Sequence, residues 1–374
     1  MAPRPRKNSE RAQLNLFRAL GGDFAPRDAQ DLMAYPFFSL AKSPRIIPID
    51  FQMNEITIRV EAVPEHGMAT IWDADILIWA ASQIVEARDA GLPTSRLMAA
   101  TPYEILTFIG RGTGARDYER LRAALDRLQS TTVATSLRQI GKRRMHRFSW
   151  INEWAERTDA NGKSDGIDLI LPDWFYRAVL DDGLVLTIDP AYFELNGGLE
   201  RWLYRLVRKH AGRQPTGWRF DLRHLYLKSG VLSSFRRFKF DLHDIAHRQA
   251  LPGYRLRIEH RTFGREVLTF SRAKISTDNL CKSLWIRCGK PVDTVVLSGT
   301  ASDVPSGTAV TCYQEQKPPF LSLESDSSGT RNLESNLKES NSFLGGPNGP
   351  HWKAGKEKRR RAEPRNDAGK EGAP

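Results

Sequence analysis

The feature of this sequence that most constrains its fold is an order of expected elements that occurs twice: two helices followed by a β-hairpin. In each copy the second helix carries apolar residues at steps of three and four, which places them along one side. These two helices are expected at about residues 116–129 and 235–248. The apolar residues are Tyr118, Leu121, Leu125 and Leu128 in the first helix and Phe235, Phe238, Leu242 and Ile245 in the second. Each helix therefore has one face for a core and another free for charged side chains.

A β-hairpin is expected after each of these helices. Residues 131–139 and 145–154 have the composition of strands and flank a basic turn, GKRR, at 141–144. Residues 251–272 contain two alternating segments around a turn near Arg261–Gly264. Helix, turn, helix and hairpin is the order of a winged helix, whose last helix enters the DNA major groove while the hairpin contacts the backbone or the minor groove.

The sequence therefore predicts an α+β fold built from two tandem winged-helix domains, at residues 36–180 and 181–275. Residues 1–35 are polar and weakly periodic, and we expect them to form a flexible arm. Residues 276–374 lose the periodicity and become rich in Ser, Gly, Pro and Asn. They are expected to be a largely disordered tail, because such a composition buries too little apolar surface to fold.

Shorter signals predict the boundaries of other elements. Residues 45–60 are typical of two strands around a turn. Asp73 is expected to cap a helix that runs to about residue 90. Thr101, followed three residues later by Glu104, has the spacing of a capping box at the start of another helix.

The net charge of +12 lies almost entirely in the part expected to fold, since residues 1–299 carry +11 of it. Residues 116–147 hold nine basic residues against three acidic ones, and residues 201–240 hold eleven against one. The helix expected at 199–211 contributes four basic residues that we expect to point outward: Arg201, Arg205, Arg208 and Lys209. Charge concentrated in this way attracts a polyanion, although a solvated helix face is the alternative for a single cluster.

No pattern typical of an active site, a metal site or a cofactor site is found. GRGTGARD at 110–117 lacks the Lys-Ser/Thr of a phosphate-binding loop, and His243 and His247 lack the acidic residue of a zinc-binding HExxH motif. The scattered acidic residues Asp165, Asp168 and Asp173 are interpreted as turn and cap residues. Three cysteines without a CxxC, and no apolar run of 18 residues, favour a cytoplasmic protein that needs no disulfide and has no membrane segment.

Several long segments are similar to the replication initiator protein A family of proteobacterial plasmids. These segments are MAYPFFSLAKSPR (33–45), STTVATSLR (130–138), RFSWINEW (147–154), ERWLYRLVRKHAG (200–212) and GWRFDLRHLYLKSG (217–230). The resemblance covers about residues 30–275. It implies a bacterial plasmid replication initiator that binds repeats in origin DNA and helps to open the duplex. It also implies recruitment of the host initiator and the replicative helicase, and repression of its own gene as part of copy-number control. A homodimer is a further possibility, and no catalytic residue is implied.

The double-stranded DNA contacts are expected on the outer faces of the two second helices and at the wings. The residues concerned are Arg116, Arg120 and Arg127, then Lys142, Arg143 and Arg144 at the first wing, and Ser234, Arg236, Arg237 and Lys239 in the second copy. Arginine can donate two hydrogen bonds to a guanine edge, which makes it suited to this role.

Two other functions stay open at this point. The first is a winged-helix transcriptional regulator without a direct role in replication, which composition cannot distinguish from an initiator. The second is an enzyme that acts on DNA, a nuclease or a relaxase. We expect a DNA-binding protein rather than an enzyme, because the sequence contains no credible set of catalytic residues.

Overall fold

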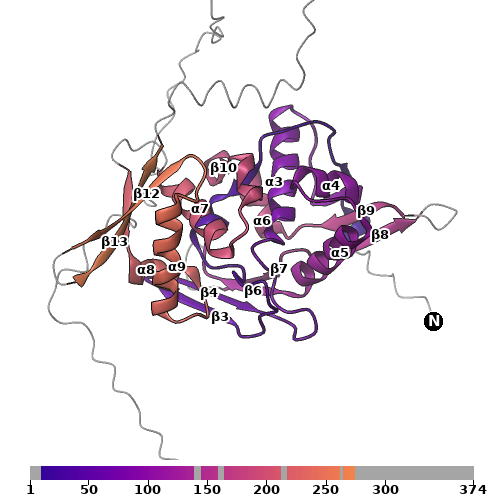
Figure 1. The fold of residues 1–374 in the computed structure, drawn as a ribbon. Helices are drawn as coiled ribbons and strands as arrows, with labels where there is room; N and C mark the ends of the chain where they lie inside the picture. The colour runs from indigo at the N-terminus through magenta and orange to yellow at the C-terminus, as the bar shows by residue number, and fades with distance from the viewer. Residues whose placement is uncertain (1–9, 139–144, 159–163, 212–216, 262–263, 274–374) are drawn as a thin grey trace, which may run out of the picture. The chain divides into compact units, whose positions relative to one another are not determined.

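The computed structural model describes residues 10–138, 145–158, 164–211, 217–261 and 264–273. All of them lie in one compact unit of helices and strands, so the α+β class predicted from the sequence is confirmed (Figure 1). Within the described residues, no helix combines the length and the hydropathy that a membrane crossing requires. The expected C-terminal tail lies outside the described residues.

One succession of elements occurs twice along the chain: a helix, a strand, two helices and two strands, with two further strands (Thr132–Thr135 and His146–Ser149) inserted before the last two strands of the first copy. The first copy consists of α3 (Ala74–Asp89), β5 (Leu97–Ala100), α4 (Pro102–Phe108), α5 (Ala115–Ser130), β8 (Glu153–Thr158) and β9 (Ser164–Ile170). The second copy consists, in the same order, of α7 (Gly198–Ala211), β11 (Trp218–Asp221), α8 (Leu222–Ser229), α9 (Phe235–Arg248), β12 (Tyr254–His260) and β13 (Glu266–Arg272). In both copies the last strand pairs antiparallel with the single strand on one side and with its hairpin partner on the other. The recurrence therefore extends from element order to strand pairing, and Figure 1 shows the two hairpins concerned, β8–β9 and β12–β13.

The hairpin that the sequence assigned to the first wing belongs to a different sheet. Strands β6 (Thr132–Thr135) and β7 (His146–Ser149) do pair antiparallel, as predicted. However, β6 also pairs with β4 (Ile56–Glu61), and the sheet order is β3-β4-β6-β7, where β3 is Ile49–Met53. The assignment of this hairpin as the wing is wrong, because β9 and not β7 pairs with β5. The position equivalent to β12–β13 is taken by β8–β9.

Residues 10–35 are not a flexible arm, so that prediction is wrong for the described part of the segment. Strand β1 (Leu16–Arg18) pairs parallel with β5, and β2 (Arg27–Ala29) pairs antiparallel with β10 (Val185–Thr187). Helix α2 (Gln30–Ala34) buries three of its five residues, and α1 (Glu10–Gln13) precedes the strands. Elements of three to five residues are too short for an apolar period to show in a sequence.

Local signals in the sequence predict the helix starts well. Thr101 and Glu104 form the expected capping box: the Thr101 hydroxyl accepts from the Glu104 amide at 3.2 Å, and the Thr101 amide donates to Glu104 Oε2 at 2.6 Å. Helix α6 (Asp173–Leu180) follows Pro172, and the short 3-10 turns η1 (Asp182–Leu184) and η2 (Pro190–Glu194) lead to α7. Asp73 immediately precedes α3, but its carboxylate accepts from the Thr70 amide instead of capping the helix.

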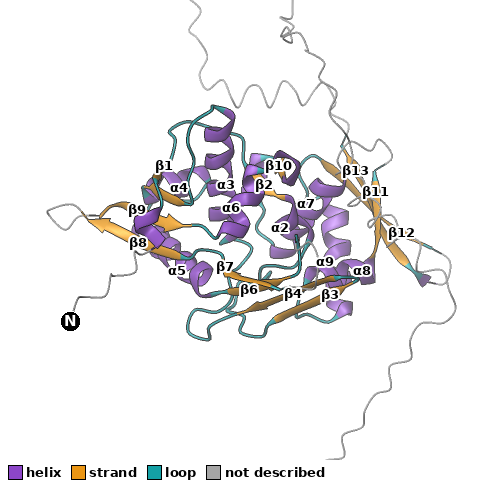
Figure 2. Ribbon diagram, turned by 180° about the vertical axis from the view of Figure 1, so that it is seen from behind, coloured by secondary structure: helices purple, strands orange, loops and turns teal. Residues whose placement is uncertain are grey.

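A single hydrophobic core runs through both copies of the repeated succession. Leu121, Leu125 and Leu128 of α5 belong to it, and so do Phe238, Leu242 and Ile245 of α9. Elements outside the two copies bridge them: β2 pairs with β10 and packs against α3 of the first copy, and α2 packs against α7 of the second, which can be followed in Figure 2. The border expected near residue 180 therefore separates two copies of a topology and does not separate two cores.

Candidate nucleic-acid interface

Helix α9 presents an exposed basic face at its first turn. The Ser234 hydroxyl caps the helix by accepting from the Arg237 amide at 3.3 Å. Phe238, Leu242 and Ile245 are buried, whereas Arg236 and Arg237 are exposed. Among the described residues, the ion-pair partner of Arg237 is Asp241, one turn further along the same helix, at 2.9 Å. An exposed ion pair of this kind contributes little, so the guanidinium is available to another anion.

The orientation of α9 is held by a buried carboxylate on the adjacent hairpin. Lys239 Nζ lies 2.6 Å from Glu266 Oε2 at the start of β13, and His243 and His260 approach the other oxygen of Glu266 at 3.4 Å. Burial would raise the pKa of Glu266, but the hydrogen bond and charge of Lys239 outweigh it and lower the pKa. Lys239, expected to contact DNA, is thus partly engaged in fixing the helix to the hairpin.

Two exposed features of the second copy were missed in the sequence. Phe240 is 64% exposed on α9, with Arg237 stacked 5.3 Å from its ring centre. Arg255 and Arg257 are exposed at alternate positions of β12, and the described residues contain no acidic partner for them. The alternation of YRLRIEH along a strand would have revealed both arginines, because successive side chains point to opposite faces.

Helix α5 presents a smaller exposed basic surface. Arg116 is exposed, and Arg120 is 73% exposed, with one ion pair of 3.3 Å to Asp117. Arg122, also exposed, is hydrogen-bonded to Glu156 of β8. The basic turn residues expected at the first wing (Lys142, Arg143 and Arg144) lie outside the described residues, and the hairpin that carries them is not the equivalent of β12–β13.

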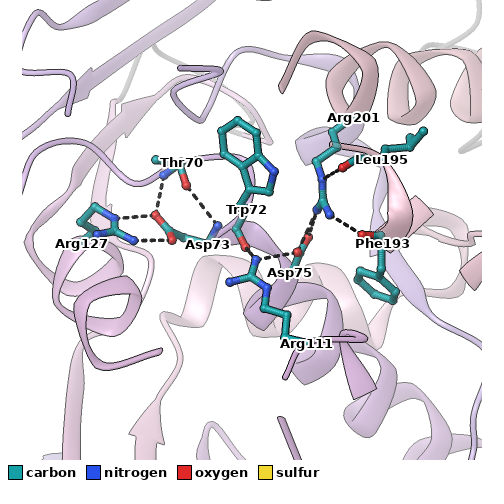
Figure 3. A network of polar contacts seen from close by, with 9 residues as sticks. All are labelled: Thr70, Trp72, Asp73, Asp75, Arg111, Arg127, Phe193, Leu195 and Arg201. Carbon is teal, nitrogen blue, oxygen red and sulfur yellow. Dashed lines mark hydrogen bonds and ion pairs between the residues drawn. The ribbon is translucent and has the colours of Figure 1, made fainter. Parts of the chain in front are cut away.

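Arg127 does not lie with Arg116 and Arg120. Its guanidinium makes a two-pronged contact with the buried carboxylate of Asp73, at 2.8 Å and 2.7 Å (Figure 3). Such paired hydrogen bonds between charged groups are short and directional. The hydrogen bond to Asp73, together with its charge, raises the pKa of Arg127 although burial opposes this. Arg127 therefore fixes α5 against the start of α3, and we no longer count it among the DNA contacts.

The prediction that α7 points its arginines outward is wrong for Arg201 and Arg205. Arg201 donates to both oxygens of the fully buried Asp75 at 2.8 Å (Figure 3). Arg205, only 1% exposed, pairs with the equally buried Asp28 at 2.6 Å. Burial would lower the pKa of Arg205, but the charge and hydrogen bonds of Asp28, together with Tyr192 and Asp75, raise the pKa. Both aspartates come from the N-terminal part of the chain, so no pattern within α7 could reveal them.

Comparison with known proteins identifies the class to which this fold and these basic helices belong. Residues 27–256 match the family described as Replication initiator protein A. A "Putative replication protein" of Wigglesworthia glossinidia brevipalpis is 30% identical over 244 residues, which cover 64% of this chain and 86% of that protein. The chain is thus related to replication initiators. It belongs to the replication initiator protein A family, as the sequence resemblance indicated.

Solved structures of RctB are also similar to this chain. Domains 2 and 3 of RctB superpose with a TM-score of 0.49 at 14% identity, covering 66% of this chain and 99% of that one. A second crystal structure of the same two domains gives a TM-score of 0.44 at 15% identity.

Proposed function

We propose that this protein initiates replication by binding double-stranded origin DNA through two winged-helix modules, one in each copy of the repeated succession. The observation that carries the proposal is α9: its apolar stripe is buried, a buried carboxylate ties it to the following hairpin, and Arg236 and Arg237 are exposed at its first turn. A helix held in this way can enter a major groove as a rigid element. Family membership supports the role in replication.

Within this proposal the two modules have unequal parts. The second module offers Arg236, Arg237 and Phe240 on α9 together with Arg255 and Arg257 on β12. The first offers Arg116 and Arg120 on α5. Two modules on one chain increase avidity when their DNA sites lie within reach of each other. We further propose that the protein helps to open the duplex, recruits the host initiator and the replicative helicase, represses its own gene and can form a homodimer, as the family resemblance implies.

We also propose that the protein acts without catalysing a reaction on DNA. Among the described residues there is no group of three or more His, Cys, Asp or Glu side chains that could hold a metal ion. Incubation of the full chain with supercoiled origin DNA and Mg²⁺ tests this. The plasmid should stay supercoiled, and nicking at a defined site would contradict the proposal.

The DNA-binding proposal is tested by changing both exposed arginines of α9 in the full chain. Arg236→Ala with Arg237→Ala should weaken binding to an origin duplex more than tenfold and reduce the slope of log affinity against log salt, because fewer counterions are released. Fluorescence anisotropy at several salt concentrations measures both quantities. The matched control is Arg59→Ala with Arg177→Ala, which removes two exposed arginines outside α5, α9 and β12.

The control should bind as the wild type does, and circular dichroism should show that both variants are folded. Unchanged affinity in the folded α9 variant would contradict the assignment. If the protein instead protects only a promoter, and its plasmid replicates without it, the transcriptional-regulator alternative is correct.

A further inference from the structure

A cavity of about 590 Å³ lies where the two copies of the repeated succession meet. The segments that line it are the loops before α3, the loop between α4 and α5, α5 itself, and the turn from η2 into α7. Five Lys and Arg side chains face it against two aspartates. The basic residues are Lys42, Arg111, Arg120, Arg127 and Arg201, and the aspartates are Asp73 and Asp117. The cavity therefore has a positive lining and suits an anion.

Part of this lining is neutralised and serves as a rigid wall. Arg127 is paired with Asp73, and Arg201 is paired with Asp75, which lies immediately behind the wall (Figure 3). Arg201 also donates to the backbone oxygens of Phe193 and Leu195, at 2.7 Å and 2.6 Å. The donors of both guanidinium groups are largely used within the protein. The wall is thereby formed before any ligand arrives.

Three other cations keep donors that are free for a ligand. Arg111 uses a single terminal nitrogen, Nη2, which donates to the Trp72 oxygen at 2.7 Å and to Asp75 at 2.9 Å. The described residues provide no acceptor for its remaining N–H groups. Lys42 is exposed and has no acidic partner in the described part of the chain. Within the described ranges, Arg120 has a single ion pair, the exposed one with Asp117.

A flat aromatic surface lies beside these free cations. The indole ring of Trp72 is half-buried in the cavity lining, and Lys42 Nζ is 5.6 Å from its centre. An anion held by Lys42 is therefore close to the ring. Phe193, Met68 and Leu195 add apolar surface on the other sides. Aromatic side chains bind nucleic-acid bases by stacking, and each stacked base contributes about 1–3 kcal/mol.

We propose that this cavity binds a nucleoside phosphate. Its phosphate groups lie among Lys42, Arg111 and Arg120, and its base stacks on Trp72. A mononucleotide fits a volume of this size, since small-molecule pockets span roughly 300–1,000 Å³. A ligand in this position contacts both copies of the repeated succession. It also engages Arg120, so it should compete with DNA at α5; this last consequence rests on the proposed function.

The experiment is a calorimetric titration of the full chain with ATP, in the absence of DNA. ATP should bind with a dissociation constant below about 1 mM. Lys42→Ala should weaken binding more than tenfold, and Arg177→Ala, which removes an exposed cation on α6, should leave it unchanged. Trp72→Phe should retain binding, whereas Trp72→Ala should weaken it. Circular dichroism checks that each variant is folded.

Separate titrations with pyrophosphate and with adenosine distinguish the two parts of the ligand. Each should bind more weakly than ATP. Pyrophosphate that binds as tightly as ATP would overturn the base-stacking part, and no ATP binding at millimolar concentration would overturn the whole proposal. Displacement of ATP by a short single-stranded oligonucleotide at a concentration much lower than that of ATP would also overturn the proposal, because it would indicate a groove that binds a nucleic-acid strand. Because DNA duplex is absent, these outcomes are independent of whether α9 binds the origin.

Discussion

At the scale of single residues, the most consequential feature is the division of basic side chains between surface and interior. Residues 201–240 hold eleven basic residues and one acid, yet Arg201, Arg205 and Lys228 of this stretch are buried. A buried arginine is tolerated only where a carboxylate and further acceptors satisfy it, because moving an unpaired charge out of water is costly. Local charge density therefore overstates the basic surface of this protein.

The Arg205–Asp28 pair allows a test of whether a buried charge depends on its partner of opposite charge. Arg205→Met should lower the free energy of unfolding by about 3–5 kcal/mol, because it leaves a buried carboxylate unpaired. Adding Asp28→Leu should recover most of the loss, since Arg205 Nη1 already has no hydrogen-bond partner in the described residues and apolar replacements of such pairs are often neutral. Urea unfolding measures both variants. A double variant no more stable than Arg205→Met alone would contradict the explanation.

Lys228 predicts a dependence of stability on pH. It is 4% exposed, lies 4.9 Å from the ring centre of Tyr35, and has Lys209 and His224 as charged or titratable neighbours. Burial, reinforced by the charge of Lys209, lowers its pKa from 10.5 to about 7. Between these values the unfolded chain binds more protons than the folded one, so stability should rise with pH.

Lys228→Met removes the free-energy cost of burying a protonated lysine. We therefore expect the variant to stabilise the protein most below about pH 7 and hardly at all near pH 10. Melting temperatures of the wild type and the variant at about pH 6 and pH 10 give the comparison. If the melting temperature of the variant exceeds that of the wild type by more at pH 10 than at pH 6, the lysine is charged and favourably paired in the folded state.

At the scale of elements, helices were predicted better than sheets. Helices α5 and α9 begin and end within about two residues of their expected bounds, and α4 begins at the predicted capping box, because capping residues and apolar spacing are local signals. The hairpin β6–β7 was also predicted, but its place in the fold was not. Its residues pair with each other across a turn, whereas its pairing with β4 depends on a strand more than seventy residues earlier.

The apolar stripe of α5 can be tested separately from its basic face. Leu125 is fully buried, so Leu125→Ala should reduce the free energy of unfolding by about 2–5 kcal/mol through the cavity it leaves. Arg116→Ala, on the exposed side of the same helix, should change it by about 0.5 kcal/mol or less. Chemical denaturation monitored by circular dichroism measures both. Equal effects would mean that the helix is not oriented as described.

At the scale of the whole molecule, the two copies share one hydrophobic core and are linked by the buried Arg201–Asp75 ion pair, while the buried Arg205–Asp28 pair ties α7 to the N-terminal strand β2. We expect unfolding of this part of the chain in a single cooperative transition. Scanning calorimetry and urea unfolding, followed by tryptophan fluorescence and by circular dichroism, should give coincident midpoints. Two well-separated transitions would show that the copies unfold independently.

The sequence by itself determined the longer helices and the hairpins β3–β4, β6–β7 and β12–β13, and through its long motifs it indicated the family. It also located Arg116, Arg120, Arg236 and Arg237 on exposed faces, because amphipathic spacing assigns each position to a side of its helix. The tertiary structure alone decided that the hairpin β8–β9, and not β6–β7, pairs with β5, how residues 10–35 join the core, and that Arg127, Arg201 and Arg205 pair with aspartates. Those outcomes depend on contacts between residues far apart in the chain, and a helical period carries no information about the charge on the element that packs against it.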